Sequence, residues 1–124
     1  MIGKWLNYMS RLHDGVDAIL IADRHGIIEY SAMFSEQENG LIDEGFIGKN
    51  ILEVYPELTE ETSSHFRVMR TGKPVINEKQ VLTDFHGRRI MLVSSTFPLE
   101  DGGELIGTME TSVFYHKDSQ LDGK

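Results

Sequence analysis

The sequence predicts an α+β fold, with a five-stranded antiparallel sheet that carries helices on one face. Apolar residues recur at helical spacing near the start and in the middle of the chain, and after Pro74 they change to extended runs separated by glycine-containing turns. This segregation of helices and strands is typical of the α+β class. With 124 residues, 40% of them hydrophobic, the chain predicts one domain with one core.

Charge and cysteine content exclude several classes of function. The formal net charge is −8, which argues against direct nucleic-acid contact and against binding to an anionic membrane surface. The chain has no cysteine, so disulfides, zinc–thiolate sites, iron–sulfur clusters and cysteinyl-flavin photochemistry are excluded. There is no apolar run that could span a bilayer and no signal peptide, so we expect a cytoplasmic protein.

The first segments predict a helix followed by a hairpin. Residues 2–13 have apolar side chains at helical spacing, which predicts a short amphipathic helix. Residues 18–22 (AILIA) and 27–30 are short apolar runs on either side of a turn that contains Gly26, and together they predict a β-hairpin.

The middle of the chain predicts short helices and then one longer helix. Residues 36–61 have eight acidic side chains and one basic one, which is typical of a solvated face with loops and short helices. Residues 59–71 form the strongest helical pattern, with Thr59 as the expected cap at its start and Gly72 after its end.

Three further strands are predicted over residues 75–85, 89–97 and 105–114, separated by His86-Gly87 and by the glycine pair near residue 102. The remaining residues are polar. We therefore divide the chain into a helix over residues 1–14, a domain over residues 15–116, and a polar tail or linker over residues 117–124.

The order of these elements and their local motifs resemble a PAS sensory domain. The resemblance covers about residues 9–114. It rests on the segments DGVDAILIADRHGIIEYSA, FIGKNILEVYP, HFRVMRTGKPVI and GRRIMLVSSTFPLEDGGELIGTMETSVF, in this order and spacing. The chain departs from the family's pattern at Ala32, where many members have Asn, and at residues 113–116, where many have an Asp-Ile-Thr-like sequence. The resemblance implies a sensor that binds a small molecule.

One segment, VMRTGKPVINEKQVLTDFHGRRIMLVSSTFPL, is similar to the N-terminal sensor domains of sigma-54-dependent transcriptional activators, especially those that regulate arginine use. This resemblance implies arginine or ornithine as the ligand. It also implies that an ATPase domain and a DNA-binding domain of the same full-length protein are the downstream partners.

Polar residues at alternate positions in the predicted strands are the candidates for ligand recognition. These residues are Glu29, Ser94, Thr96, Thr108, Glu110 and Ser112. The simpler interpretation places most of them on the solvent side of the sheet. The functional interpretation places one or two in a ligand cavity, where Glu29 or Glu110 would bind a cationic group, because an unpaired buried charge is costly. The candidate ligand-binding residues are Glu29, Thr96, Glu110, Phe66 and Met69.

Catalysis and cofactor binding are not expected. The sequence has no nucleophile elbow, phosphate-binding loop or paired carboxylates, so we expect no enzymatic activity and no catalytic residues. Five histidines have no metal-ligand spacing. His65 lies on the long predicted helix, where some haem-binding PAS domains have their axial ligand, but a histidine packed against the sheet or facing solvent is the favoured interpretation. We expect no metal and no cofactor.

The N-terminal helix has Trp5, Met9 and Leu12 along one stripe, which predicts a homodimer interface. Two other functions remain open at this point. The first is a constitutive dimerisation module without ligand, in which Phe66, Met69, Met91 and Leu92 fill the cavity. The second is a haem or flavin sensor.

Overall fold

The computed structural model describes residues 16–33, 44–83, 87 and 89–114. The helix predicted over residues 2–13, the proposed dimer residues Trp5, Met9 and Leu12, and the tail after residue 116 lie outside these described residues.

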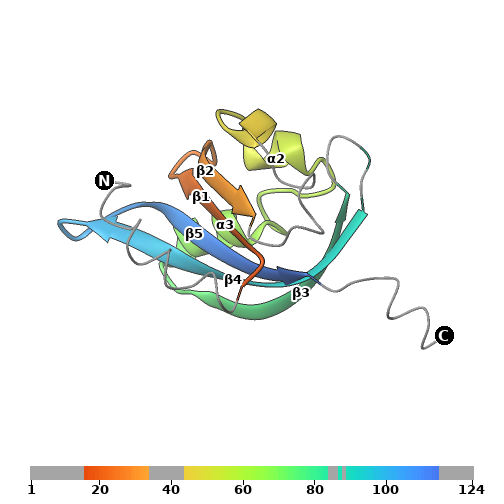
Figure 1. The fold of residues 1–124 in the computed structure, drawn as a ribbon. Coiled ribbons are helices and arrows are strands. Elements are labelled where there is room, and N and C mark those ends of the chain that lie inside the picture. Colours follow the sequence, from red (N-terminus) through yellow and green to blue (C-terminus); the bar gives the residue numbers. More distant parts are fainter. Residues whose placement is uncertain (1–15, 34–43, 84–86, 88, 115–124) are drawn as a thin grey trace.

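Five antiparallel strands form one sheet in the order β2-β1-β5-β4-β3 (Figure 1). Strands from the two ends of the described chain, β1 and β5, therefore lie side by side, and β5 is the central strand. This confirms the predicted five-stranded antiparallel sheet. The strands are β1 (Ala18–Asp23), β2 (Ile28–Met33), β3 (Val75–Thr83), β4 (Arg89–Asp101) and β5 (Glu104–Phe114).

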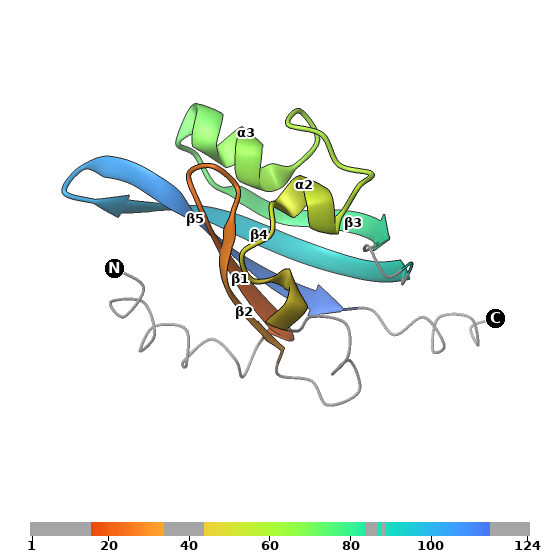
Figure 2. The same ribbon diagram turned by 90° about the horizontal axis from the view of Figure 1, so that it is seen from above.

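The helical elements η2 (Glu44–Phe46), α2 (Ile51–Val54) and α3 (Ser64–Thr71) connect β2 to β3, and α2 and α3 lie over the same face of the sheet (Figure 2). A reciprocal capping box fixes the start of α2. The Asn50 side chain accepts a hydrogen bond from the Leu52 N–H (2.9 Å), and the Glu53 side chain accepts one from the Asn50 N–H (3.2 Å).

The long predicted helix starts later than the sequence pattern indicates. Ser63, not Thr59, caps α3, and its side chain accepts a hydrogen bond from the Phe66 N–H. Thr59 instead forms a separate turn with Thr62, in which its hydroxyl accepts from the Thr62 N–H (3.2 Å). Two hydroxyl residues with similar capping ability lie four positions apart, so the pattern does not decide between them. The predicted end is confirmed, because Gly72 ends the helix in the left-handed conformation (φ 73°).

The hairpin between β4 and β5 is longer than predicted. The strand predicted over residues 89–97 continues through Pro98 to Asp101. Gly102 and Gly103 form the turn, and both have positive φ (62° and 84°), which glycine adopts without steric cost.

Apolar side chains pack on both faces of the sheet. On the helix face, Leu20 and Ala22 pack with Ile28, Phe46 and Val54, and a neighbouring cluster includes Leu82, Leu92 and Phe114. On the opposite face, Ile19 and Ile21 of the same strand pack with Leu99 and Met109. The run AILIA is therefore a strand buried on both sides, which explains why it is apolar without alternation.

Candidate ligand-binding site

The middle of the helix face of β4 and β5 is polar. Ser94 and Thr96 of β4, and Thr108 and Ser112 of β5, are buried, and Glu110 of β5 lies on the same face. The interpretation that placed most of these residues on the solvent side is therefore wrong. The remaining candidate, Glu29 on the edge strand β2, is exposed.

Two adjacent cavities lie between this face and the helices, with volumes of about 370 and 300 Å³ including their openings. Four residues line both and so form the boundary between them: Leu20, Tyr55, Leu82 and Glu110. The first cavity is otherwise lined by Ala18, Ile90, Leu92, Ser112 and Phe114. The second is otherwise lined by Ile51, Leu58, Ser63, Ser64, His65 and Gln80.

Glu110 is the acidic residue of both cavities and is partly buried. Its loss of solvent raises the pKa of its carboxyl from 4.5 to about 6, against the opposing effect of hydrogen bonds with Ser94 and Gln80. The nearby Glu78 carboxylate contributes to this increase in the pKa. Gln80 is itself held in place, because its amide donates to the Ser94 hydroxyl (2.6 Å).

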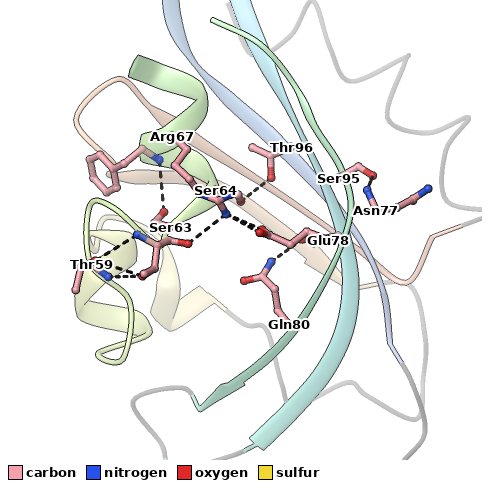
Figure 3. Close-up of polar contacts among 12 residues, drawn as sticks. Thr59, Ser63, Ser64, Arg67, Asn77, Glu78, Gln80, Ser95 and Thr96 are labelled. Atoms are coloured by element: carbon pink, nitrogen blue, oxygen red, sulfur yellow. Dashed lines mark hydrogen bonds and ion pairs between the residues drawn. The ribbon is translucent and has the colours of Figure 1, made fainter. Parts of the chain in front are cut away.

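A β-bulge directs Glu78 toward the helices. The β3–β4 register changes between Val75 and Glu78, and Asn77 in the bulge has a positive φ of 54°. As a result Glu78 pairs with Ser94 and contacts Arg67 of α3, whose Nη2 lies 2.7 and 2.8 Å from the two carboxylate oxygens (Figure 3). Arg67 thereby connects α3 to the edge strand.

His65 is buried against the sheet, as the favoured interpretation of this residue predicted. Its Nδ1 is 2.6 Å from the Thr108 hydroxyl, and its ring packs edge-on against Phe66. Nε2 is buried and has no hydrogen-bond partner. Burial lowers the pKa of the imidazole from 6.5 to about 4, although the negative charge of Asp23 opposes this shift, so His65 is neutral at pH 7.

A buried hydrogen bond also joins the start of α3 to β4. The Ser64 and Thr96 hydroxyls are 2.7 Å apart (Figure 3). Together with the His65–Thr108 contact, this bond fixes the first turn of the helix over the polar strand face.

Of the five predicted ligand-binding residues, only Glu110 lines either of these two cavities. The Thr96 hydroxyl is hydrogen-bonded to Ser64, and Glu29 is exposed. Phe66 and Met69 line neither cavity. Phe66 instead packs beneath the β1–β2 turn, where a Cβ on Gly26 would lie 2.6 Å from its ring.

The sequence patterns did not indicate that Tyr55, Gln80 and the Ser63–His65 turn line a cavity. With Thr59 as the predicted cap, Ser63 and Ser64 fall inside the predicted helix. Only Ser63 as the cap would have placed them at its start, facing the sheet. Gln80 carried no signal, since its orientation depends on the bulge before it. Of the residues proposed to fill the cavity in a ligand-free module, Leu92 lines it, but Met91 does not.

The described residues contain no group of three or more His, Asp or Glu side chains placed to hold a metal ion. They also contain no helix that is long and apolar enough to cross a membrane.

Comparison with known proteins shows similarity at the level of structure. No family model and no curated protein matches the chain. A PAS domain from Colwellia psychrerythraea aligns with a TM-score of 0.65 and 19% identity over 90% of this chain and 98% of that one. The PAS domain of BvgS from Bordetella pertussis aligns with a TM-score of 0.57 and 20% identity, covering 97% and 93%.

Larger proteins align as well. VqmA bound to DPO has a TM-score of 0.63 and 16% identity, and the alignment covers 94% of this chain but only 60% of VqmA. The Vibrio cholerae VqmA dimer gives the same TM-score and identity, with 55% of that chain covered. The sheet order, the position of α2 and α3 and these alignments lead to one conclusion: the chain has the fold of a PAS domain.

Proposed function

We propose that this domain is a sensor that binds a small cationic molecule between the helices and the sheet, with Glu110 as the group that binds the cation. The observation that carries the proposal is the position of Glu110, a partly buried carboxylate at the boundary of two cavities whose described lining contains neither Lys nor Arg. A charge in such a place destabilises the fold unless it is paired. A ligand ammonium or guanidinium group would supply the missing partner.

The size of the cavities sets a condition on binding. Most of the volume given above is open to solvent, and the enclosed part of each cavity has room for only one or two water molecules in this conformation, so a ligand must join the two cavities. Leu20, Tyr55 and Leu82 form the boundary with Glu110, and Tyr55, which follows the short helix α2, is the largest of them. We propose that a shift of Tyr55 opens this boundary and that the shift is part of the signal.

Sequence resemblance supports a more specific version of this function. The similarity to sensors of sigma-54-dependent activators suggests arginine or ornithine as the first compounds to test. It also suggests that the domain signals to an ATPase domain and a DNA-binding domain of a longer protein. The structural neighbour VqmA has been described bound to DPO.

The test is calorimetric titration of the wild-type domain and of the Glu110→Gln variant with arginine and with ornithine. We expect binding to wild type, and we expect the variant to lose about 1.5–3 kcal/mol, the usual contribution of a hydrogen bond to a charged group. Glu29→Gln is the matched control, because it removes an exposed strand carboxylate and should bind like wild type. If neither these compounds nor their carboxylate-free analogues argininamide and agmatine bind at millimolar concentration, or if both variants behave alike, the proposal is wrong. A ligand-free dimerisation module then becomes the better interpretation.

We also propose that the domain forms a homodimer through Trp5, Met9 and Leu12. The helical spacing of these residues supports this proposal, and the structural neighbour VqmA is a dimer. Replacing Trp5 and Met9 with Glu should shift the domain toward monomer in light scattering. A monomeric wild-type domain at micromolar concentration would contradict the proposal.

A further inference from the structure

We propose that the site selects a cation without a free carboxylate, so that an amine or guanidine with an uncharged polar end binds better than the corresponding amino acid. This inference rests on the proposed function, because it assumes that Glu110 binds the cationic end. It adds a statement about the opposite end of the ligand.

The charges of the cavity walls provide the first argument. Among the described residues that line the two cavities, Glu110 is the only acidic one, and there is neither Lys nor Arg. The basic residues of α3 are engaged elsewhere. Arg67 is paired with Glu78, and Arg70 donates to the Glu60 carbonyl oxygen (3.0 Å). A ligand carboxylate in these cavities would therefore lose its water without gaining a cationic partner.

The polar groups of the Ser63–His65 turn, which lines the second cavity, provide the second argument. The Ser64 hydroxyl is shared with Thr96, and the Ser63 hydroxyl already accepts from the helix. The group left over is the His65 imidazole, whose buried Nε2 has no partner. His65 is neutral at pH 7, because burial lowers the pKa of its imidazole to about 4.

A neutral imidazole matches an uncharged polar group better than an anion. In a neutral imidazole one ring nitrogen donates and the other accepts. If Nδ1 donates to the Thr108 hydroxyl, Nε2 is an acceptor, and if Nδ1 accepts from that hydroxyl, Nε2 is a donor. A carboxamide or hydroxyl satisfies both cases, because each can donate and accept. A carboxylate only accepts, and it also faces repulsion from Glu110. The expected ligand thus has a cation at Glu110 and an amide-like or hydroxyl group at His65.

The experiment compares arginine, argininamide and agmatine by calorimetry at pH 7.5 and 0.15 M salt. Argininamide has an amide in place of the carboxylate at nearly the same size, and agmatine lacks the group altogether. We expect argininamide to bind at least tenfold more tightly than arginine, with agmatine between them. A repeat at 0.5 M salt tests whether the overall negative charge of the protein causes the difference between the compounds. Attraction of that kind weakens as salt rises, whereas a contact inside the cavity leaves the order of the three affinities unchanged.

Two variants separate the contributions of the two ends. Glu110→Gln should weaken all three compounds. His65→Asn retains an amide where Nδ1 contacts Thr108 but removes Nε2, so argininamide should lose its advantage over agmatine, while the affinity for agmatine stays within twofold of wild type. The exposed Glu29→Gln should change none of the three affinities.

The outcomes distinguish this inference from the proposed function. If arginine binds as tightly as argininamide or more tightly, and Glu110→Gln weakens both, the inference is refuted and the cation site at Glu110 stands. If argininamide and agmatine bind equally well to wild type, the role of His65 is refuted. If none of the three compounds binds, the proposed function fails and the inference fails with it.

Discussion

Replacing Glu110 with Gln should make the ligand-free domain more stable at neutral pH. Glu110 is partly buried at the boundary of two cavities, and Glu78 lies close enough to raise its pKa further. The glutamine side chain has nearly the same size and can still hydrogen-bond with Ser94 and Gln80. The substitution therefore removes the charge and leaves the packing largely unchanged.

The magnitude follows from the pKa of Glu110. Folding raises this pKa from 4.5 to about 6, so the folded state binds the proton more tightly than the unfolded state. The free energy of unfolding therefore falls as pH rises from 4.5 to 6, and the loss is complete above that range. A shift of this size corresponds to about 2 kcal/mol. We expect Glu110→Gln to gain about 1–2 kcal/mol at pH 7 and to show no gain at pH 4.

Urea denaturation between pH 4 and pH 8 measures this difference directly, because the midpoint shifts while the slope stays constant. Glu29→Gln serves as the control and should stay within about 0.5 kcal/mol of wild type at every pH, since Glu29 is exposed. If Glu110→Gln is less stable than wild type at pH 7, or if its advantage does not depend on pH, then Glu110 is already adequately paired. Glu110 would then not require a ligand cation as its partner.

Three further predictions concern the surroundings of the site. Burial lowers the pKa of His65 from 6.5 to about 4, so the contribution of this residue to the free energy of unfolding should fall by about 3 kcal/mol as pH drops through this range, opposing the gain from Glu110, and His65→Asn should remove that loss from the urea pH profile. Gly107→Ala should lower stability by at least about 2 kcal/mol in thermal melts, because its Cβ would collide with the backbone of β1; a change below 0.5 kcal/mol would show that the strands can separate there. Arg67→Met should cost about 1–2 kcal/mol in urea, since it leaves Glu78 unpaired, and Arg24→Met, which breaks an exposed ion pair, should cost less than 1 kcal/mol. Equal losses for the two arginine variants would mean that the partly buried pair contributes no more than the exposed one.

The alternation of residues along the strands predicted the fold and the grouping of the polar residues, but not the face they occupy. Ser94 and Thr96 share a face with each other, as do Thr108, Glu110 and Ser112, because side chains repeat every two residues in a strand. To decide whether the polar residues face solvent or the helices, a neighbouring strand with one apolar and one polar face is needed, because its apolar face marks the side that is covered. The run AILIA of β1 is apolar on both faces, so it does not provide that reference.

Other features of the site depend on contacts between distant segments. Glu78 faces the helices because the register of β3 changes at Asn77, and no local pattern in VINEKQ reveals this change. Gln80 reaches Ser94 for the same reason. These contacts depend on the register between β3 and β4. The alternation of residues within each strand does not determine that register.

The distribution of polar and apolar residues over the two faces supports a functional origin of the polar layer. A sheet covered by helices would be more stable with apolar residues beneath them, and Ile19, Ile21 and Met109 show that these strands accommodate such residues on the opposite face. The helix face instead has a carboxylate with a raised pKa and a buried histidine with an unpartnered nitrogen. Each destabilises the ligand-free fold, and a ligand with a cation and an uncharged polar group would remove both effects. Functional sites are where sequences retain residues that reduce stability.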